Sequence, residues 1–313
     1  MASGAGEFPE GTNSNNKSTT QTLDNNFGNK SIFIDQAYLS YSPKWVPSVA
    51  GKFKLTVGKF DVKEGVYTAT NGVWDSNISL EGKVLNYNYK DLGLKGFDFF
   101  ANIGGYVVEG NVNPGTPLTL EAQQLGIKWK ITDMFNLETA YALYSMPAWT
   151  KSRANLTLAE GGGNNRTSAA FDDEKAITHT AAKFGINLPV PYFEKVTFLY
   201  ENVTNPNIES KDNKASAQGI EFGAKVGVPY VKDYTLRILD RRIERYAGWQ
   251  YMEDAHWQPN TKGAQVALTI GIVDNVSFTY DIYRLQTIDK DLSTPIADKH
   301  TKVDQRFELN VKF

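Results

Sequence analysis

Few side chains in this sequence could bind a metal or act as catalytic groups. The chain has no cysteine and three histidines, which are His179, His256 and His300. None of them occurs at a metal-binding spacing such as His-x-x-x-His, and no nucleophile motif accompanies His179. The sequence therefore predicts no metal, no cofactor and no catalytic residue, and we do not expect an enzyme.

Charged side chains gather near residues 232–254 and point to another kind of chemistry, the attraction of ions. The members are Arg237, Asp240, Arg241, Arg242, Glu244, Arg245, Glu253 and Asp254. At a pore mouth, the basic members would attract anions through the field that they focus there. The alternative is a loop base joined by exposed ion pairs, worth about 0–1 kcal/mol each. Adjacent Arg241 and Arg242 cannot both face a lumen unless the strand has ended or bulged.

The element that must carry such side chains is a β-strand with one apolar and one polar face. The last segment shows this pattern most clearly, because Val303, Gln305, Phe307, Leu309, Val311 and Phe313 alternate with Asp304, Arg306, Glu308, Asn310 and Lys312. At roughly 3.3 Å per residue and about 45° of tilt, about ten residues cross about 23 Å, the height of a lipid-facing band. Because a charge costs roughly 2–4 kcal/mol on the lipid side, charges should be confined to the other face.

Thirteen segments are predicted as strands from this alternation. They are residues 31–42, 52–61, 78–90, 96–108, 119–131, 134–146, 177–188, 193–203, 215–227, 232–243, 263–273, 275–287 and 303–313. Their connections alternate between short and long, as periplasmic turns and extracellular loops do in outer-membrane barrels. The predicted fold class is therefore all-β, an antiparallel transmembrane β-barrel, and the alternation gives each strand a direction.

Composition agrees with a barrel and excludes other classes. Hydrophobic residues make up 41%, and the chain has 16 Tyr and 17 Phe against 4 Met. There is no run of about 18 apolar residues, so no transmembrane helix is predicted. A net charge of −2 gives no basic excess that would indicate nucleic acid as a partner.

The strand directions also predict how the chain is organised. The first and thirteenth strands both descend towards the periplasm, whereas bacterial single-chain barrels have an even number of strands. We therefore expect three further strands before residue 29 and sixteen in the full-length protein. Residues 1–8 are expected to be a non-native or truncated start, because they lack the regions of a signal peptide. Residues 9–30 are expected to be an external loop, and 31–313 a single barrel domain.

The parity of each strand separates charges that would line a lumen from side chains that face lipid. The predicted pore-lining set is Lys54, Asp98, Lys128, Lys130, Glu138, Lys183, Glu221, Lys225, Arg237, Asp281, Asp304, Arg306, Glu308 and Lys312. Its signs are mixed, so no strong ion selectivity is expected. The alternative for these charges is simple solvation of a soluble sheet.

Two connections are candidates for folding inward and narrowing a pore. The first is residues 62–77, with Lys63, Glu64 and Asp75. The second is residues 147–176, with Arg153, Arg166, Asp172 and Asp173. Opposed acids and bases at a constriction would set a transverse field that screens solutes. The alternative for both is an exposed, flexible loop.

Several short motifs resemble the putative porin family of Gram-negative outer membranes. They are STTQTLDN at 18–25, IDQAYLSY at 34–41, LTVGKF at 55–60, VWD at 73–75 and Glu81-Gly82. Phe313, with apolar residues at alternate positions before it, resembles the recognition motif for barrel assembly. The resemblance implies a sixteen-stranded diffusion channel that assembles as a trimer. The sequence departs from it in lacking the N-terminal strands and in carrying Ser79-Leu80 where an Asn-Pro-like turn is expected.

The functional hypothesis is therefore a water-filled channel in the cell outer membrane for passive diffusion of ions and small hydrophilic solutes. Its expected partners are outer-membrane lipid, these solutes, the barrel-assembly machinery through Phe313, and two further copies in a homotrimer. Two alternatives remain open. One is a structural or adhesive barrel without significant conductance, and the other is a soluble β-rich binding protein whose apolar residues lie between two sheets.

Overall fold

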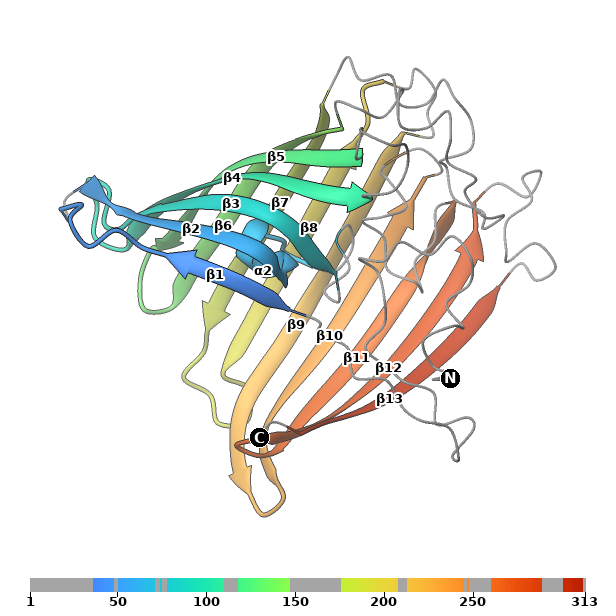
Figure 1. Cartoon of the computed structure of the whole chain (residues 1–313). Helices are drawn as coiled ribbons and strands as arrows, with labels where there is room; N and C mark the ends of the chain where they lie inside the picture. Colours follow the sequence, from blue (N-terminus) through green and yellow to red (C-terminus); the bar gives the residue numbers. More distant parts are fainter. Residues whose placement is uncertain are drawn as a thin grey trace, which may run out of the picture.

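A computed structural model describes residues 36–47, 50–70, 74, 78–109, 118–146, 176–207, 213–244, 247, 260–288 and 301–311. Within these residues, thirteen strands form one sheet in which each strand pairs with its neighbours in chain order. Every pairing is antiparallel. Figure 1 shows that the sheet curls strongly, so that the short helix α2 lies on its concave side. The all-β, antiparallel prediction is confirmed.

The strand positions agree closely with the alternation in the sequence. The strands are β1 Ala37–Tyr41, β2 Lys52–Asp61, β3 Ser79–Tyr89, β4 Phe97–Glu109, β5 Leu118–Lys130, β6 Phe135–Ser145, β7 Ile177–Asn187, β8 Lys195–Thr204, β9 Lys214–Val228, β10 Val231–Ile243, β11 Thr261–Val273, β12 Val276–Thr287 and β13 Lys302–Val311. The predicted first strand, 31–42, is described as a strand only over Ala37–Tyr41. Short and long connections alternate as predicted, which places the ends of the strands that carry long connections on the extracellular side.

The outer face of the sheet carries large apolar side chains that are open to their surroundings. Phe307 and Leu309 of β13 are 66% and 64% exposed, and Ile103 and Leu125 of β4 and β5 are 58% and 57% exposed. In a soluble sandwich these side chains would pack beneath a second sheet, which is not the case for these residues. The described outer face therefore has the character of a lipid-facing surface.

Two opposed glycines, Gly58 of β2 and Gly82 of β3, lie where neighbouring strands approach each other closely. Gly58 has φ +124°, and a Cβ atom there would lie 2.3 Å from the Ala37 carbonyl oxygen. Gly82 has φ +156°, and its Cβ atom would lie 2.2 Å from the Gly105 carbonyl oxygen. Since only glycine tolerates this conformation and this approach, the pair lets β2 and β3 fold tightly against their neighbours.

The two edges of the sheet, β1 and β13, do not pair with each other within the described residues. Because all neighbours are antiparallel, the two edge strands run in the same direction, so closure by antiparallel pairs would need an odd number of strands between them. The sixteen-strand total and the domain bounds remain predictions. Residues 1–8 and 9–30 lie outside the described residues. No helix in the described part of the chain has the length and apolarity needed to span a membrane.

Candidate functional site

The connection that follows β2 folds onto the concave face of the sheet. It begins with the single-turn helix α2, Val62–Gly65, whose N-cap Asp61 accepts a hydrogen bond from the Lys63 amide at 2.8 Å. We call the described residues 62–70 and 74 the inner segment. Its apolar members Val62, Val66, Ala69 and Trp74 are at most 4% exposed. The segment is thus packed against the wall.

Aromatic and aliphatic side chains of the wall form the seat for this inner segment. Phe60 and Tyr106 meet edge to face with ring centroids 6.1 Å apart, and both are buried. Leu80, Val84 and Leu120 are buried in the same cluster. These residues occupy inward parity, where strict alternation would place polar groups. Burial of their apolar surface stabilises the docked segment.

A ladder of three amide side chains on adjacent strands holds the backbone of the inner segment. Asn86 donates to Asn102 at 2.9 Å, and Asn102 donates to Gln124 at 2.9 Å. Gln124 accepts from the Tyr67 amide at 2.7 Å and donates to the Tyr67 carbonyl at 2.9 Å. Asn86 also donates to the Glu64 carbonyl at 3.0 Å. The ladder therefore satisfies backbone groups that leave the regular sheet at this point.

A buried carboxylate on the far side, Glu201 of β8, holds the next part of the inner segment. Its Oε1 accepts a hydrogen bond from the Ala69 amide at 2.6 Å, and its Oε2 accepts one from the Thr70 hydroxyl. The side chain is fully buried, and Oε1 lies 3.6 Å from Nε2 of the equally buried His179. Charged hydrogen bonds of this kind are about twice as strong as neutral ones. The inner segment is thus anchored at both β3–β5 and β8.

A third anchor lies beside the second and involves aromatic side chains. The Trp74 indole donates to the Tyr144 hydroxyl at 3.2 Å, and this hydroxyl bonds with His179 Nδ1 at 2.9 Å. The Trp74 and Tyr144 rings meet edge to face with centroids 5.5 Å apart. The buried histidine is therefore part of a structural chain of polar groups.

Tyr67 is the residue of the inner segment that meets the charges of the wall. The Nζ atoms of Lys183 and Lys128 lie 5.4 and 5.7 Å from its ring centroid, within the range of cation–π interactions. Burial and the negative charge of Glu138 raise the pKa of the Tyr67 phenol well above its ordinary value. The phenol therefore remains neutral and presents a protonated hydroxyl.

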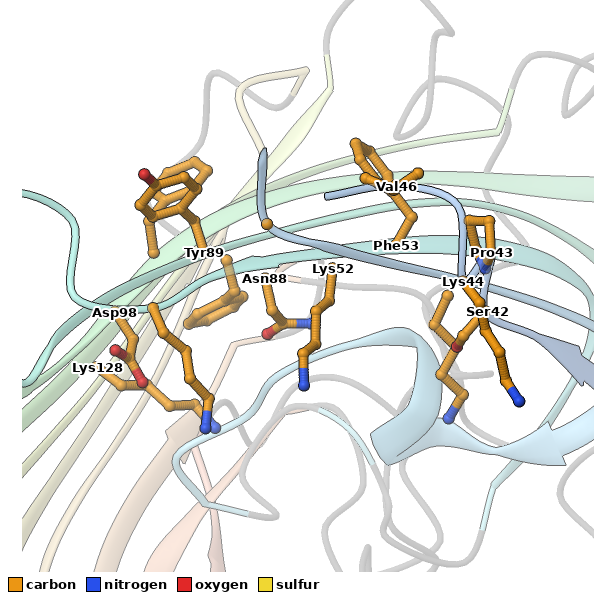
Figure 2. Close-up of a pocket in the computed structure, with 15 residues that line it drawn as sticks. Ser42, Pro43, Lys44, Val46, Lys52, Phe53, Asn88, Tyr89, Asp98 and Lys128 are labelled. Atoms are coloured by element: carbon orange, nitrogen blue, oxygen red, sulfur yellow. The ribbon is translucent and has the colours of Figure 1, made fainter. Parts of the chain in front are cut away.

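Two adjoining cavities lie near the ends of β2–β5 that carry the short connections, and the smaller one is also lined by the inner segment. The larger, of about 600 Å³, is lined by five lysines, Lys44, Lys52, Lys54, Lys90 and Lys128, and by Asp98. The smaller, of about 220 Å³, shares Lys54 and Lys128 and adds Lys63 and Glu64. In Figure 2, Lys52, Asp98 and Lys128 extend towards the side where α2 lies, whereas Val46 and Phe53 extend away from it. Of the lysines named here, only Lys54 forms an ion pair with a described residue, which is Glu64.

Charges along the rest of the inner wall alternate in sign from one strand to the next. Asp98, Lys128, Glu138 and Lys183 are successive register partners on β4–β7. Glu221 and Arg237 are partners on β9 and β10 and form a hydrogen-bonded ion pair with oxygen–nitrogen distances of 2.6 and 2.8 Å. On β12 and β13, Asp281 lies 3.3 Å from Arg306, which lies 3.0 Å from Glu308. Beyond the lysine-rich cavities, which Asp98 and Lys128 also line, the charges named here nearly balance.

The structure places the described members of the predicted pore-lining set at inward parity. These residues are Lys54, Asp98, Lys128, Lys130, Glu138, Lys183, Glu221, Lys225, Arg237, Asp281, Asp304, Arg306 and Glu308. Lys130 is at the strand end and pairs with Asp133 at 2.6 Å. Their role as the lining of a channel remains a prediction.

The predicted cluster around residues 232–254 is divided between the two faces. Arg237 and Arg241 lie at inward parity, Arg241 being 2% exposed, whereas Arg242 is exposed on the outer face. The strand continues to Ile243 without ending between the two arginines, so they lie on opposite faces. The cluster is therefore not a single pore-mouth group.

The predicted constriction residues are only partly described. Lys63 and Glu64 of the first loop lie at the smaller cavity. Asp75, Arg153, Arg166, Asp172, Asp173, Arg245, Lys312 and Phe313 lie outside the described residues, as do His256 and His300.

The residues that hold the inner segment do not stand out in the sequence. They are Asn86, Asn102, Gln124, Tyr144 and Glu201, which lie on five different strands. A usable pattern was present in β6, where Ala140, Tyr141, Ala142, Leu143 and Tyr144 are apolar or aromatic at both parities. A spanning strand with two apolar faces must pack against something on its inner side.

Comparisons with known proteins place the chain in a family. The profile of a family described as "Putative porin" matches residues 8–174, which is more than half of the 313 residues. No curated protein matches the chain. The crystal structure of Pseudomonas aeruginosa OccK5 (OpdH) is 11% identical with a TM-score of 0.43, and the match covers 83% of this chain and 68% of that one. Acinetobacter baumannii OccAB3 is 9% identical with a TM-score of 0.44, covering 88% and 67%. With its antiparallel sheet, apolar outer face and polar inner wall, the chain belongs to the putative porin family of outer-membrane channels.

Proposed function

We propose that the inner segment is the constriction of a passive channel for ions and small hydrophilic solutes. Membership of the putative porin family makes the protein an outer-membrane channel for solute diffusion. The inner segment would set the width of its pore. The observation that carries it is the contact between Ala69, Thr70 and Glu201. These residues are 131–132 positions apart, so the segment extends from β2 to β8 across the inner side of the sheet.

The anchoring favours one position of the segment. A polypeptide that lies inside a pore narrows it reproducibly only if its backbone groups are bonded and its apolar side chains are buried. Gln124 and Glu201 satisfy the backbone groups, and the seat around Phe60 buries the side chains. Solutes would therefore pass between the side of the segment that faces away from its seat and the ion-paired charges on β9–β13.

The experiment that tests this function is single-channel recording of Glu201→Gln in planar bilayers. The amide cannot accept charged hydrogen bonds from both Ala69 and Thr70, and each such bond contributes about 1.5–3 kcal/mol. Since about 1.4 kcal/mol is a factor of ten in an equilibrium, we expect openings to a larger conductance level to become at least about tenfold more frequent.

The matched control is Glu221→Gln, which removes another inner-wall carboxylate that pairs with Arg237 and forms no hydrogen bond or ion pair with the described part of the inner segment. It should leave the distribution of conductance levels close to that of the native protein. If the two variants behave alike, Glu201 does not hold a constriction. If the native protein is silent in the bilayer, a structural or adhesive barrel is the better account.

We further propose that the lysine-rich cavities give the channel a weak preference for anions. Lys44, Lys52 and Lys90 have no ion-pair partner within the described residues, whereas the charges on β9–β13 are largely paired. Unpaired charges of one sign in a cleft concentrate counter-ions there.

The remaining parts of the functional hypothesis are proposals as well. We propose that the chain has no catalytic activity and that it acts as a homotrimer. We also propose that Phe313 is recognised during barrel assembly, which the outward alternation of Phe307, Leu309 and Val311 supports. Mass measurement of the detergent-solubilised protein would test the trimer, and membrane insertion of a Phe313→Ala variant would test the assembly motif.

A further inference from the structure

A group of basic side chains lies on the outer face of the sheet, at the extracellular ends of β10–β12. Arg242 and Lys262 are direct register partners. Lys262 is opposite Gln286, and Arg284 is two residues from Gln286 on the same face. All three basic side chains are exposed. We call Arg242, Lys262 and Arg284 the outer basic cluster.

The cluster is only partly neutralised by its own chain within the described residues. Like charges directly opposite each other destabilise a pair of strands. Arg242 donates to Glu244 at 3.1 Å, but this carboxylate also accepts a hydrogen bond from the Lys214 amide at 3.2 Å. Asp240 lies on the same face, two residues before Arg242, and both it and Arg284 are register partners of Ala264, so Asp240 lies one strand from Arg284. Lys262 and Arg284 form no ion pair with any described residue.

Other charges on the outer face, on β2–β5, are arranged differently. Lys59 is the direct register partner of Glu81. Lys83 and Glu121 are both register partners of Gly105, so they lie on the same face one strand apart. The two bases there are matched by two acids, whereas the outer basic cluster has three bases against Asp240 and Glu244. The outer face near the extracellular side can therefore carry charges without an excess of basic side chains. The excess in the outer basic cluster is a feature of β10–β12.

The height of the cluster suggests its partner. Ile238 and Val266, 41% and 39% exposed on the outer face, begin the apolar band four residues nearer the periplasm than Arg242 and Lys262. At about 3.3 Å per residue and about 45° of tilt, four residues correspond to a rise of about 9 Å. Basic side chains at this distance from the hydrocarbon lie at headgroup level, where they bind anionic lipids.

We propose that Arg242, Lys262 and Arg284 bind the phosphate groups of a phosphorylated glycolipid in the outer leaflet of the outer membrane. Arginine guanidinium groups bind phosphate oxygens through two parallel hydrogen bonds, and the lysine adds a point charge. The like-charge contact between Arg242 and Lys262 is relieved when an anion lies between them. This site faces lipid, and its existence depends neither on the constriction nor on ion preference.

The test measures binding of lipid A to the folded protein in detergent by native mass spectrometry. The double variant Lys262→Gln/Arg284→Gln should lose about tenfold in affinity for bis-phosphorylated lipid A, since 1.4 kcal/mol over two charged contacts gives this factor. The matched control is Lys59→Gln/Lys83→Gln on β2 and β3, which should change the affinity by less than about twofold. Dephosphorylated lipid A should bind the native protein and the double variant equally weakly.

Further readouts separate this site from folding and from channel function. Heat-modifiable migration on a gel reports whether each variant is folded, and Arg284→Lys, which keeps the charge, should retain most of the affinity. Equal losses in the two double variants would reduce the effect to general surface charge and overturn the site. Unchanged affinity, or equal affinity of the native protein for both forms of lipid A, would also overturn it. Single-channel conductance should be the same in all these variants.

Discussion

The inner wall has two regions that are built on different rules. On β2–β8 the wall is apolar and amide-lined towards the extracellular side, and the inner segment covers it, so that Phe60, Val84 and Tyr144 are fully buried. On β13, and on β10–β12 as far as Arg237 and Asp281, the inner face is polar, and Asp281, Arg306 and Glu308 form ion pairs along it. Nearer the extracellular side, Leu239, Ile243 and Leu285 of the same face are buried. One region is a docking surface and the other a solvated surface. The difference shows that one sheet can hold a structured obstacle on one side and leave the opposite side to water.

The variant Trp74→Ala should reduce the difference between the two regions most, because it should release the inner segment from the wall. Loss of a buried tryptophan in a packed core costs about 3–5 kcal/mol, and here the loss falls on the docking of the inner segment. We expect protease cleavage within residues 62–78 of the folded barrel, together with larger and noisier conductance. Trp129→Ala, on the outer side of β5, is the control and should leave this segment protected. Full protection in Trp74→Ala would mean that the apolar seat is not what retains the segment.

The solvated wall should tolerate change better, and a double-mutant cycle on Glu221 and Arg237 measures by how much. Their side chains are 22% and 33% exposed, so solvent screening limits their coupling to about 1 kcal/mol. Urea unfolding of Glu221→Gln, Arg237→Gln and the double variant in lipid vesicles gives the value. A coupling as large as the effect of Trp74→Ala would remove the distinction between the two walls.

The strand pattern could be predicted from the sequence because lipid imposes a strict rule on every second residue. The thirteen strands, their directions and the inward parity of Lys128 and Glu138 follow from this rule. The docking of the inner segment could not be predicted in the same way. Glu201 and Gln124 resemble any other wall residue until the fold brings them to residues more than 50 positions away.

A smaller effect should come from single lysines of the larger cavity. Lys52→Gln removes one of five lysines there, so the reversal potential in a salt gradient should move modestly towards the value of an unselective pore. Lys83→Gln, on the outer face of β3, carries the same charge change and should have no effect. An equal shift in both variants would show that overall charge, not the cavity, determines ion preference.

The smallest effect is expected at the exposed pair Lys232–Asp274, beside the turn that joins β11 and β12. The hydrogen bond from Lys232 lowers the pKa of Asp274, so any stabilisation is present above the ordinary pKa of the carboxyl and is lost as the pH falls. Because both groups are fully exposed, Lys232→Ala should leave the urea midpoint unchanged between neutral and acidic pH. A clear, pH-dependent loss of stability would show that this turn contributes more than its geometry indicates.

The most direct test of the docked inner segment is photo-cross-linking from position 67 in native outer membranes. Tyr67 is replaced by a photoreactive phenylalanine analogue, and the products are mapped by mass spectrometry. The Tyr67 ring centroid lies 5.5 Å from that of Phe100 and 5.4 Å from Lys183 Nζ. We therefore predict cross-links to peptides of β4, β5 and β7. Cross-links only to lipid or to other connections, with none to these strands, would contradict a segment seated against the inner wall.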